Sequence, residues 1–292
     1  MPSIVCIRCA ACVNIRRTRS KRMLTRVIPS TGEALPVIGC GTYVGFDRAP
    51  GTAGFDRLPG VVQALFDAGG SVIDSSPMYG KAEAAVGQVL ARLGQRERAF
   101  LATKVWTSGR AAGIRQMENS LQLLGADSID LLQVHNLLDW QNQLASLRQW
   151  KAAGRIRYLG ITHYTSSAYA DVEEVLRGEA LDFLQVNYSL EDQGAARRLL
   201  PLAAERGVAV LVNMPFGGGR MMRRLRDKPL PSWAEEIGCK SWSQVLLKFV
   251  LGHPAVTCAI PGSGSPEHMA QNAAAGEGVI PEMSYWKDKK LP

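Results

Sequence analysis

The feature that most constrains the fold is a regular alternation of short apolar runs with segments of helical periodicity. Eight strand-like runs follow one another along the chain, at 37–41, 71–74, 99–104, 129–135, 156–162, 181–187, 208–212 and 256–260. Helix-like segments lie between and after them, at 59–68, 82–93, 111–124, 141–153, 166–177, 195–205, 241–252 and 266–274. This alternation predicts parallel strands joined by helical crossovers.

Eight strand–helix units in about 250 residues are the number and the size of a (β/α)8 barrel. A doubly wound open sheet is the alternative, but that fold places a Gly-x-Gly-x-x-Gly loop after its first strand, and this chain has none there. No linker divides the chain. We therefore predict the α/β class and a single (β/α)8 TIM barrel over residues 26–292, which opens with a short hairpin turning at Gly32.

Serines mark several predicted helix starts, because a serine hydroxyl accepts a hydrogen bond from a free backbone N–H of the first turn. Ser166 and Ser241 stand at such positions, and Ser265 precedes Pro266 in the same way.

The charge of the chain is uneven. The net charge is +8, but residues 1–26 hold seven basic residues and no acid, which leaves 27 basic and 26 acidic residues elsewhere. We expect residues 1–25 to form a disordered basic arm, and we expect no binding of nucleic acid by the body of the protein; contact of the arm with nucleic acid or an anionic surface stays open.

The predicted arm also carries Cys6, Cys9 and Cys12, a spacing that can begin an iron–sulfur site. The fourth ligand of such a site would fall at Arg16, so we predict no metal. The chain has neither an apolar run of about 20 residues nor an apolar stretch after its basic start. We therefore expect no membrane association and a cytoplasmic location.

Four residues with complementary chemistry stand at or just after the ends of the second, third and fourth predicted strands. They are Asp74, Tyr79, Lys104 and His135. Catalytic side chains of a barrel gather at the carboxyl ends of its strands, so we expect these four to meet. A free tyrosine has a pKa near ~10, which a nearby ammonium lowers. Tyr79 would then protonate a carbonyl oxygen, with Lys104 held by Asp74 and with His135 donating to the same oxygen.

The motifs around these residues resemble those of the aldo-keto reductases. They are Asp74-Ser75-Ser76-Pro77-Met78-Tyr79-Gly80, Ala102-Thr103-Lys104 and Leu131-Leu132-Gln133-Val134-His135, supported by the segments 39–42, 215–217 and 260–263. The resemblance extends from about Arg26 to Gly276. It implies a (β/α)8 barrel, nicotinamide-dependent reduction of a carbonyl, a catalytic tetrad of the four residues above, and no metal.

The resemblance also implies a cofactor site, to which this chain fits less closely. The expected cofactor-binding residues are Thr162, His163, Gln185, Asn213, Pro215, Phe216, Gly217, Gly262, Ser263, His268 and Asn272. Thr162-His163 replaces a Ser-Asn pair that holds the nicotinamide amide, and Asn213 replaces a stacking tyrosine found in many members. Gly262 and His268 stand where a lysine and an arginine commonly grip the 2′-phosphate. We expect NADP, with NAD possible, and weak discrimination between them.

The sequence thus predicts an NAD(P)(H)-dependent oxidoreductase that reduces an aldehyde or ketone to an alcohol, or runs the reverse reaction. A non-catalytic, cofactor-binding regulatory or interaction protein of the same fold is the alternative. The expected partner is a small carbonyl compound, bound by a monomer or a weak homo-oligomer. Tyr43, Trp106 and Trp140 are candidates for the walls of the substrate pocket.

Overall fold

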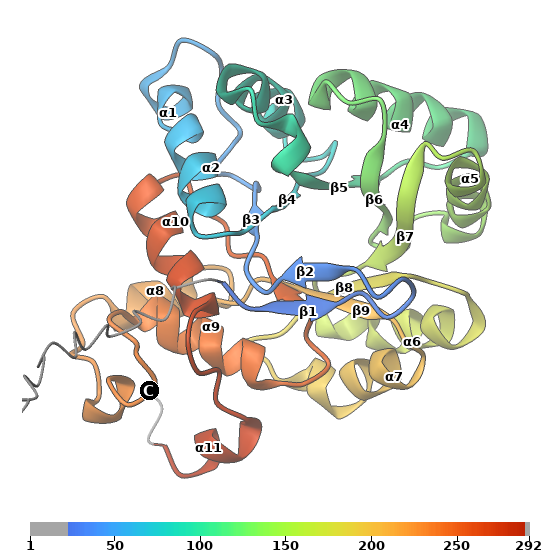
Figure 1. The fold of residues 1–292 in the computed structure, drawn as a ribbon. Coiled ribbons are helices and arrows are strands. Elements are labelled where there is room, and N and C mark those ends of the chain that lie inside the picture. The colour runs from blue at the N-terminus through green and yellow to red at the C-terminus, as the bar shows by residue number, and fades with distance from the viewer. Residues whose placement is uncertain (1–22, 290–292) are drawn as a thin grey trace, which may run out of the picture.

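A computed structural model describes residues 23–289, and its centre is one sheet of eight parallel strands (Figure 1). The strands lie side by side in chain order: β3 (Cys40–Gly41), β4 (Val72–Asp74), β5 (Phe100–Val105), β6 (Ile129–His135), β7 (Ile156–Thr162), β8 (Phe183–Asn187), β9 (Ala209–Asn213) and β10 (Cys258–Ala259). Parallel bridges from Ile38 to Ala259 and from Gly41 to Gly262 join the first strand to the last. The predicted (β/α)8 barrel is therefore confirmed.

Eleven α-helices of the described residues surround the sheet (Figure 1). They are α1 (Ala53–Asp56), α2 (Leu58–Asp67), α3 (Ala82–Leu93), α4 (Arg110–Leu124), α5 (Trp140–Ala152), α6 (Tyr169–Gly178), α7 (Leu199–Glu205), α8 (Arg220–Leu225), α9 (Trp242–Gly252), α10 (Pro266–Ala273) and α11 (Met283–Lys287). Short 3-10 turns lie at Arg96–Arg98, Ser166–Ala168, Gly194–Arg197, Ser232–Ala234 and Ala274–Gly276. Each helix predicted from the sequence has a counterpart, and α1, α8 and α11 are additional short helices.

Two of the three predicted serine caps are correct. Ser241 accepts a hydrogen bond from the backbone N–H of Gln244, and Ser265 accepts one from His268. Ser166 is not a cap, because it begins a 3-10 turn and α6 starts only at Tyr169.

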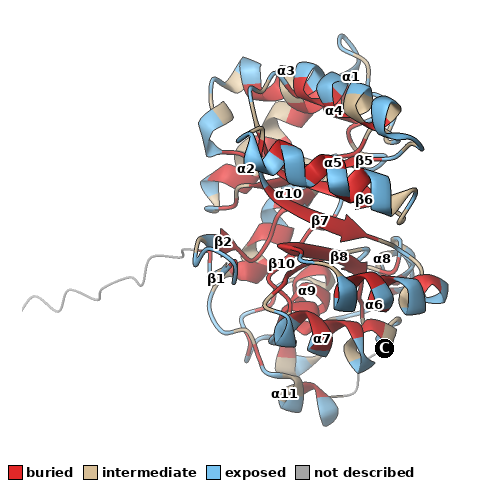
Figure 2. Cartoon of the chain, turned by 90° about the vertical axis from the view of Figure 1, so that its right-hand side faces the viewer, coloured by how far each residue is buried: buried red, intermediate tan, exposed pale blue. Residues whose placement is uncertain are grey.

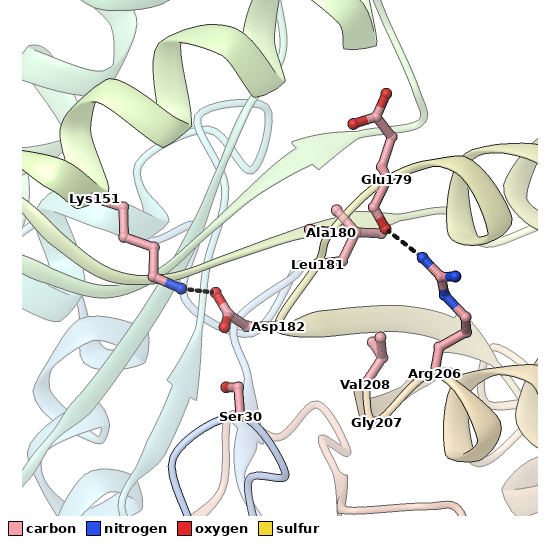
Figure 3. A pocket seen from close by; sticks show the side chains of 9 residues that line it. All are labelled: Ser30, Lys151, Glu179, Ala180, Leu181, Asp182, Arg206, Gly207 and Val208. Carbon is pink, nitrogen blue, oxygen red and sulfur yellow. Dashed lines mark hydrogen bonds and ion pairs between the residues drawn. The ribbon is translucent and has the colours of Figure 1, made fainter.

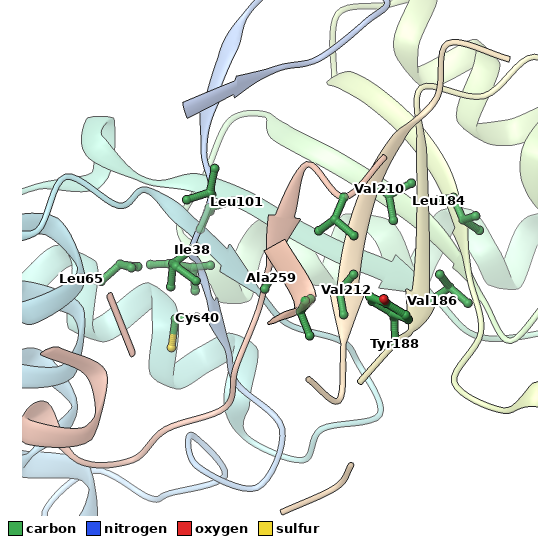
Figure 4. Close-up of a cluster of buried hydrophobic side chains, with 14 of the residues drawn as sticks. Ile38, Cys40, Leu65, Leu101, Leu184, Val186, Tyr188, Val210, Val212 and Ala259 are labelled. Atoms are coloured by element: carbon green, nitrogen blue, oxygen red, sulfur yellow. The ribbon is translucent and has the colours of Figure 1, made fainter. Parts of the chain in front are cut away.

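The strands separate two apolar cores because successive side chains point to opposite faces. Figure 2 shows that the strands of the barrel are largely buried. On β9, Leu211 lies in the core inside the barrel, while Val210 and Val212 lie in the larger core between the sheet and the helices (Figure 4). Inside the barrel, the rings of Tyr158 and Phe183 meet edge to face at 5.5 Å.

The predicted hairpin consists of β1 (Thr25–Val27) and β2 (Ala34–Pro36), and it lies across the amino-terminal end of the barrel (Figure 1). Gly32 turns with a φ of 76°, which a glycine adopts without a steric penalty. Ile28 and Leu35 are buried in the inner core. The hairpin therefore closes the amino-terminal end of the barrel with apolar side chains, and its Thr31 and Glu33 hydrogen-bond the hydroxyl of Tyr158 there.

The first described residues already pack on the barrel. Met23 is 4% exposed, and the backbone N–H of Leu24 donates to the carbonyl of Gly276. Residues 1–22, with Cys6, Cys9 and Cys12, lie outside the described residues, so the division into arm and barrel stays a prediction.

Between residues 23 and 289, no helix has the length and apolar character needed to cross a bilayer.

Candidate active site

The structure brings the four predicted catalytic side chains together at the carboxyl ends of β4, β5 and β6. Lys104 Nζ lies 2.7 Å from Asp74 Oδ2 and 5.1 Å from the centre of the Tyr79 ring. The rings of Tyr79 and His135 are 6.0 Å apart, nearly perpendicular. Lys104 is fully buried, and Asp74 is 2% exposed. One acid, one cation, one phenol and one imidazole thus share a small, largely dry space.

The ammonium of Lys104 is well paired for a buried charge. Besides Asp74, it donates to the backbone carbonyl of Ser75 at 2.6 Å. Burial alone would lower the pKa of Lys104, but the negative charges of Asp74 and an ionised Tyr79 outweigh burial and raise it. Lys104 therefore stays positively charged beside Tyr79 at physiological pH.

Two opposing effects act on Tyr79. Burial raises the pKa of its hydroxyl above the ordinary value, while the Lys104 ammonium lowers it, and the net shift is upward. Tyr79 is consequently a protonated phenol at neutral pH, with a cation beside it that stabilises the anion formed when the proton leaves. The Lys104 ammonium thus acts in the expected direction, but burial outweighs it, so the net lowering of the Tyr79 pKa expected from the sequence is not found. Tyr79 keeps the proton that a general acid must carry.

His135 is held in one neutral form. Burial, helped by the charges of Lys104 and of His163, lowers the pKa of His135 to about 3. Its Nδ1 lies 3.1 Å from Ser76 Oγ, and Ser76 Oγ already accepts from the backbone N–H of Met78. In the tautomer in which Ser76 donates its proton to Nδ1, the proton of His135 lies on Nε2, where it is available to a substrate oxygen. Sequence reasoning missed Ser76, although it lies inside the 74–80 run.

A second missed residue is Gln133. It is fully buried in β6, two positions before His135, and therefore points to the same inner face. Its Nε2 lies 3.4 Å from Asp74 Oδ1, and Gln185 Nε2 donates to the same oxygen at 2.8 Å. Asp74 thus accepts amide hydrogens on one oxygen and the Lys104 ammonium on the other. Gln133 could have been found from the sequence, because residues two positions apart in a strand point to the same face and His135 was already a candidate.

The predicted cofactor residues on β7, β8 and β9 form a connected polar set. Thr162 Oγ1 donates to Gln185 Oε1 at 3.1 Å, so both ends of the Gln185 amide have protein partners. Asn213 Nδ2 donates to the carbonyl of His163 at 3.3 Å. Asn213 Oδ1 is buried and has no hydrogen-bond partner among residues 23–289. A buried acceptor without a donor fits an incoming amide N–H.

The remaining predicted cofactor residues lie on two loops. Ser263 Oγ donates to the carbonyl of Ser265 and accepts from its N–H, which shapes the turn at the start of α10. His268 is exposed in the first turn of α10. The others occupy the bridge to β3, a buried position on α10 and the loop after β9: Gly262, Asn272, Pro215, Phe216 and Gly217. The assignment of these residues to a cofactor stays a prediction.

Aromatic side chains lie beside the rings of Tyr79 and His135. The ring of Tyr43 lies 5.1 Å from that of Tyr79, and Trp106 lies 6.4 Å from His135. Tyr43 is 64% exposed and Trp106 is 40% exposed, so both present apolar surface to an incoming molecule. Trp140 instead packs against the core between the sheet and the helices.

A hollow of about 390 Å³ lies elsewhere, at the amino-terminal end of the strands beside the hairpin (Figure 3). It is lined by Ser30, Lys151, Glu179, Ala180, Leu181, Asp182, Arg206, Gly207 and Val208. Lys151 pairs with Asp182 at 2.6 Å, and Arg206 donates to the carbonyl of Glu179. Lys151, Asp182 and Arg206 thus already have partners within the lining, and no histidine, tyrosine or cysteine lines the hollow, so the Tyr79 region is the better candidate for chemistry.

Comparison with known proteins shows the family of this chain. The family model of the Aldo/keto reductase family matches residues 38–289. Methylglyoxal reductase YeaE of Escherichia coli is 31% identical over 87% of this chain and 90% of its own length, and the NADH-specific methylglyoxal reductase of the same species is 26% identical over 70% and 78%. An aldo/keto reductase from Klebsiella pneumoniae, solved in complex with NADP and acetate, is 31% identical over 89% and 91%, with a TM-score of 0.74. The chain belongs to the aldo/keto reductase family, and its fold is the (β/α)8 barrel of that family.

Proposed function

We propose that this protein reduces an aldehyde or ketone to an alcohol, or runs the reverse oxidation, with NADP(H) as its cofactor. The nicotinamide supplies or accepts a hydride when it is bound. The observation that carries the proposal is the buried Lys104–Asp74 pair against the ring of Tyr79. A buried ion pair with no chemical task is a costly way to fill a barrel that apolar residues could fill.

Each residue of the site has a distinct role in this proposal. Tyr79 gives its hydroxyl proton to the carbonyl oxygen, and the Lys104 ammonium stabilises the phenolate that remains. His135 donates from Nε2 to the same oxygen and thereby orients the carbonyl next to Tyr79. In the oxidation direction, the tyrosinate takes the proton back from the alcohol.

The polar set on β7 to β9 supports a nicotinamide site. The orphan acceptor Asn213 Oδ1 and the hydroxyl of Thr162 suit a carboxamide, which both donates and accepts hydrogen bonds. The Klebsiella relative was solved with NADP, which favours NADP here as well. Gly262 and the exposed His268 bring no fixed charge to a 2′-phosphate, so we propose only modest discrimination against NADH.

The substrate in this proposal is a neutral carbonyl compound with an apolar substituent. Tyr43 and Trp106 offer exposed ring surface next to Tyr79 and His135. The Escherichia coli relatives are named for methylglyoxal, a small dicarbonyl, which makes it the first compound to compare with an aromatic aldehyde such as benzaldehyde.

A cofactor-oxidation assay over a panel of aldehydes and ketones tests the proposal. Tyr79→Phe removes only the hydroxyl, and we expect turnover to fall by at least ~100-fold. Tyr43→Phe is the matched control, because it removes a hydroxyl from the adjacent ring, and it should retain most of the activity. Unchanged turnover in Tyr79→Phe would refute the mechanism. Tight NADPH binding by the wild-type protein without turnover on any substrate would point to the non-catalytic alternative.

A further inference from the structure

The loops after β5 and β6 are tied together by a small set of buried and backbone contacts. We propose that Asp139 and Gln143 are positioning residues that lock the loop 106–109 onto the loop 136–139 and thereby hold Trp106 beside His135. This inference rests on the proposed function, since it concerns how that site is shaped for its substrate. We call these two residues the inter-loop clamp.

Asp139 stands at the N-cap of α5, but its side chain does not cap that helix. Instead, Asp139 Oδ2 accepts from the backbone N–H of Gly109 at 2.7 Å, across to the neighbouring loop. Aspartate at an N-cap ordinarily accepts from the first turn of its own helix. Here no backbone N–H of the first turn donates to the carboxylate: Oδ1 accepts from the Asn142 side chain at 2.9 Å, and Oδ2 is directed to the neighbouring loop, so one oxygen of the carboxylate serves the loop junction.

Gln143 completes the junction one turn further into α5. It is fully buried, and its Nε2 donates to the carbonyl of Thr107 at 3.1 Å and lies 3.4 Å from both the carbonyl of Gly109 and Asp139 Oδ2. The fit is tight, because a Cβ at Gly113 would lie only 2.1 Å from Gln143 Oε1. Gly113 belongs to α4, so both α4 and the loop 106–109 that precedes it contact Gln143 of α5.

The backbone of Trp106 is also held by α4, the helix that follows the loop. Gln116 of α4 accepts from the backbone N–H of Trp106 at 2.5 Å and donates to its carbonyl at 3.2 Å. The indole is 40% exposed and 6.4 Å from the ring of His135. The backbone of the loop is thus held at Trp106, Thr107 and Gly109, while the indole faces outward at the mouth of the site.

The backbone around the clamp is strained. Among residues 23–289, five non-glycine residues have a positive φ, all on loops that follow strands of the barrel at its carboxyl end: Val44, Asn136, Leu137, Asp139 and Met214. Three of them fall within the four residues after His135. Positive φ values in non-glycine residues persist only where the surrounding contacts enforce them. The clamp supplies such contacts, and the strained loop would otherwise relax away from Trp106.

Three substitutions of Asp139 distinguish the loss of its hydrogen bonds from the effect of its positive φ. Asp139 has a φ of 52°. Asparagine tolerates that conformation and keeps a side-chain acceptor. Glycine tolerates it but has no side-chain acceptor, and alanine neither tolerates it nor has an acceptor. Asp127→Ala is the control, since it removes an exposed aspartate just before β6, at the opposite end of the barrel. Gln143→Leu tests the second member of the clamp.

Steady-state kinetics with benzaldehyde and with methylglyoxal provide the first readout. For benzaldehyde, we expect kcat/KM to fall about tenfold in Asp139→Gly, Asp139→Ala and Gln143→Leu, mainly through a higher KM, as expected when binding surface is lost. Asp139→Asn should stay within about threefold of the wild type, and methylglyoxal, which is too small to cover the indole, should lose less than about threefold in every variant. Equal losses for both substrates, or an unchanged KM for benzaldehyde in Asp139→Gly, would overturn the proposal.

Acrylamide quenching of Trp106 fluorescence provides a readout that does not depend on activity. The chain has six tryptophans, so the signal of Trp106 is taken as the difference between each protein and the same protein carrying Trp106→Phe. We expect quenching of Trp106 to increase in Asp139→Gly and not in Asp139→Asn. Unaltered quenching in Asp139→Gly would contradict the clamp. Absence of wild-type turnover on every carbonyl would instead count against the proposed function, and quenching would still test the clamp.

Discussion

Replacing Lys104 with methionine tests how the site is held together. Methionine fills a similar volume without the charge. Lys104 Nζ has two partners, Asp74 Oδ2 at 2.7 Å and the carbonyl of Ser75 at 2.6 Å, and Lys104 is fully buried. Its removal leaves the buried carboxylate of Asp74 without a cation. Breaking a buried pair from one side costs about 3–5 kcal/mol, so we expect a loss of that size in the free energy of unfolding.

The expected change in melting temperature follows from the size of the folded part. Unfolding entropy near the midpoint is about 2.1 cal/mol/K per residue, or about 0.6 kcal/mol/K for a barrel of this length. A loss of about 3–5 kcal/mol therefore lowers Tm by about 5–9 °C. Urea unfolding followed by circular dichroism gives the free energy, and calorimetry gives Tm.

The double variant Asp74→Asn/Lys104→Met removes both charges and keeps an oxygen that accepts from Gln185. We expect it to regain at least half of the stability lost in Lys104→Met, because no uncompensated charge stays buried. Arg57→Met is the control, since Arg57 pairs with Glu267 at 3.4 Å on the surface and should cost less than about 1 kcal/mol. A loss below about 1 kcal/mol in Lys104→Met, or simple additivity in the double variant, would refute the reasoning.

Three further outcomes are expected. The kcat/KM for carbonyl reduction should be flat from about pH 5 to about pH 9 and fall only in strong alkali, because burial raises the pKa of Tyr79 and the pKa of His135 is about 3; a pH–rate profile measures this. His268→Arg should raise the ratio of kcat/KM with NADPH to that with NADH about tenfold, as one charged contact to a 2′-phosphate would. Lys248→Met should lower the free energy of unfolding by about 3 kcal/mol in urea titrations, because the buried Lys248 ammonium donates to the carbonyls of Ile237, Glu277 and Val279, which would be left unsatisfied.

The repeating pattern made most of the barrel predictable. The boundaries of β6 and β7 match the predicted runs, because both strands are seven residues long and each begins with a buried isoleucine. The first strand was harder to predict: the run 37–41 reduces to Cys40–Gly41, since the residues before it pair only through an isolated bridge at Ile38. The short helix α8 has three arginines among its six residues, and a segment of that length is too short to show an apolar stripe from which to predict it.

The predicted catalytic residues could be located in the sequence for a reason that does not apply to the groups that hold them. Asp74, Lys104 and His135 each end or nearly end a strand, and parallel strands bring such ends together whatever the side chains are. Ser76 and Gln133 act only through specific atoms of His135 and Asp74. Contacts of that kind depend on rotamers and on distances of a few tenths of an ångström, which residue type and spacing do not determine.

Gln185 shows why the catalytic and the cofactor parts of the site are one network. Its Nε2 donates to Asp74 and its Oε1 accepts from Thr162, and it is 1% exposed. Because an amide has a donor end and an acceptor end, a flip of Gln185 would place its oxygen against the Asp74 carboxylate. The charge on Asp74, which Lys104 also requires, therefore fixes the orientation of Gln185 and, through it, the direction of the Thr162 hydroxyl at the end of β7. A substitution that removes the charge of Asp74 would thus act directly on the residues proposed to hold the nicotinamide.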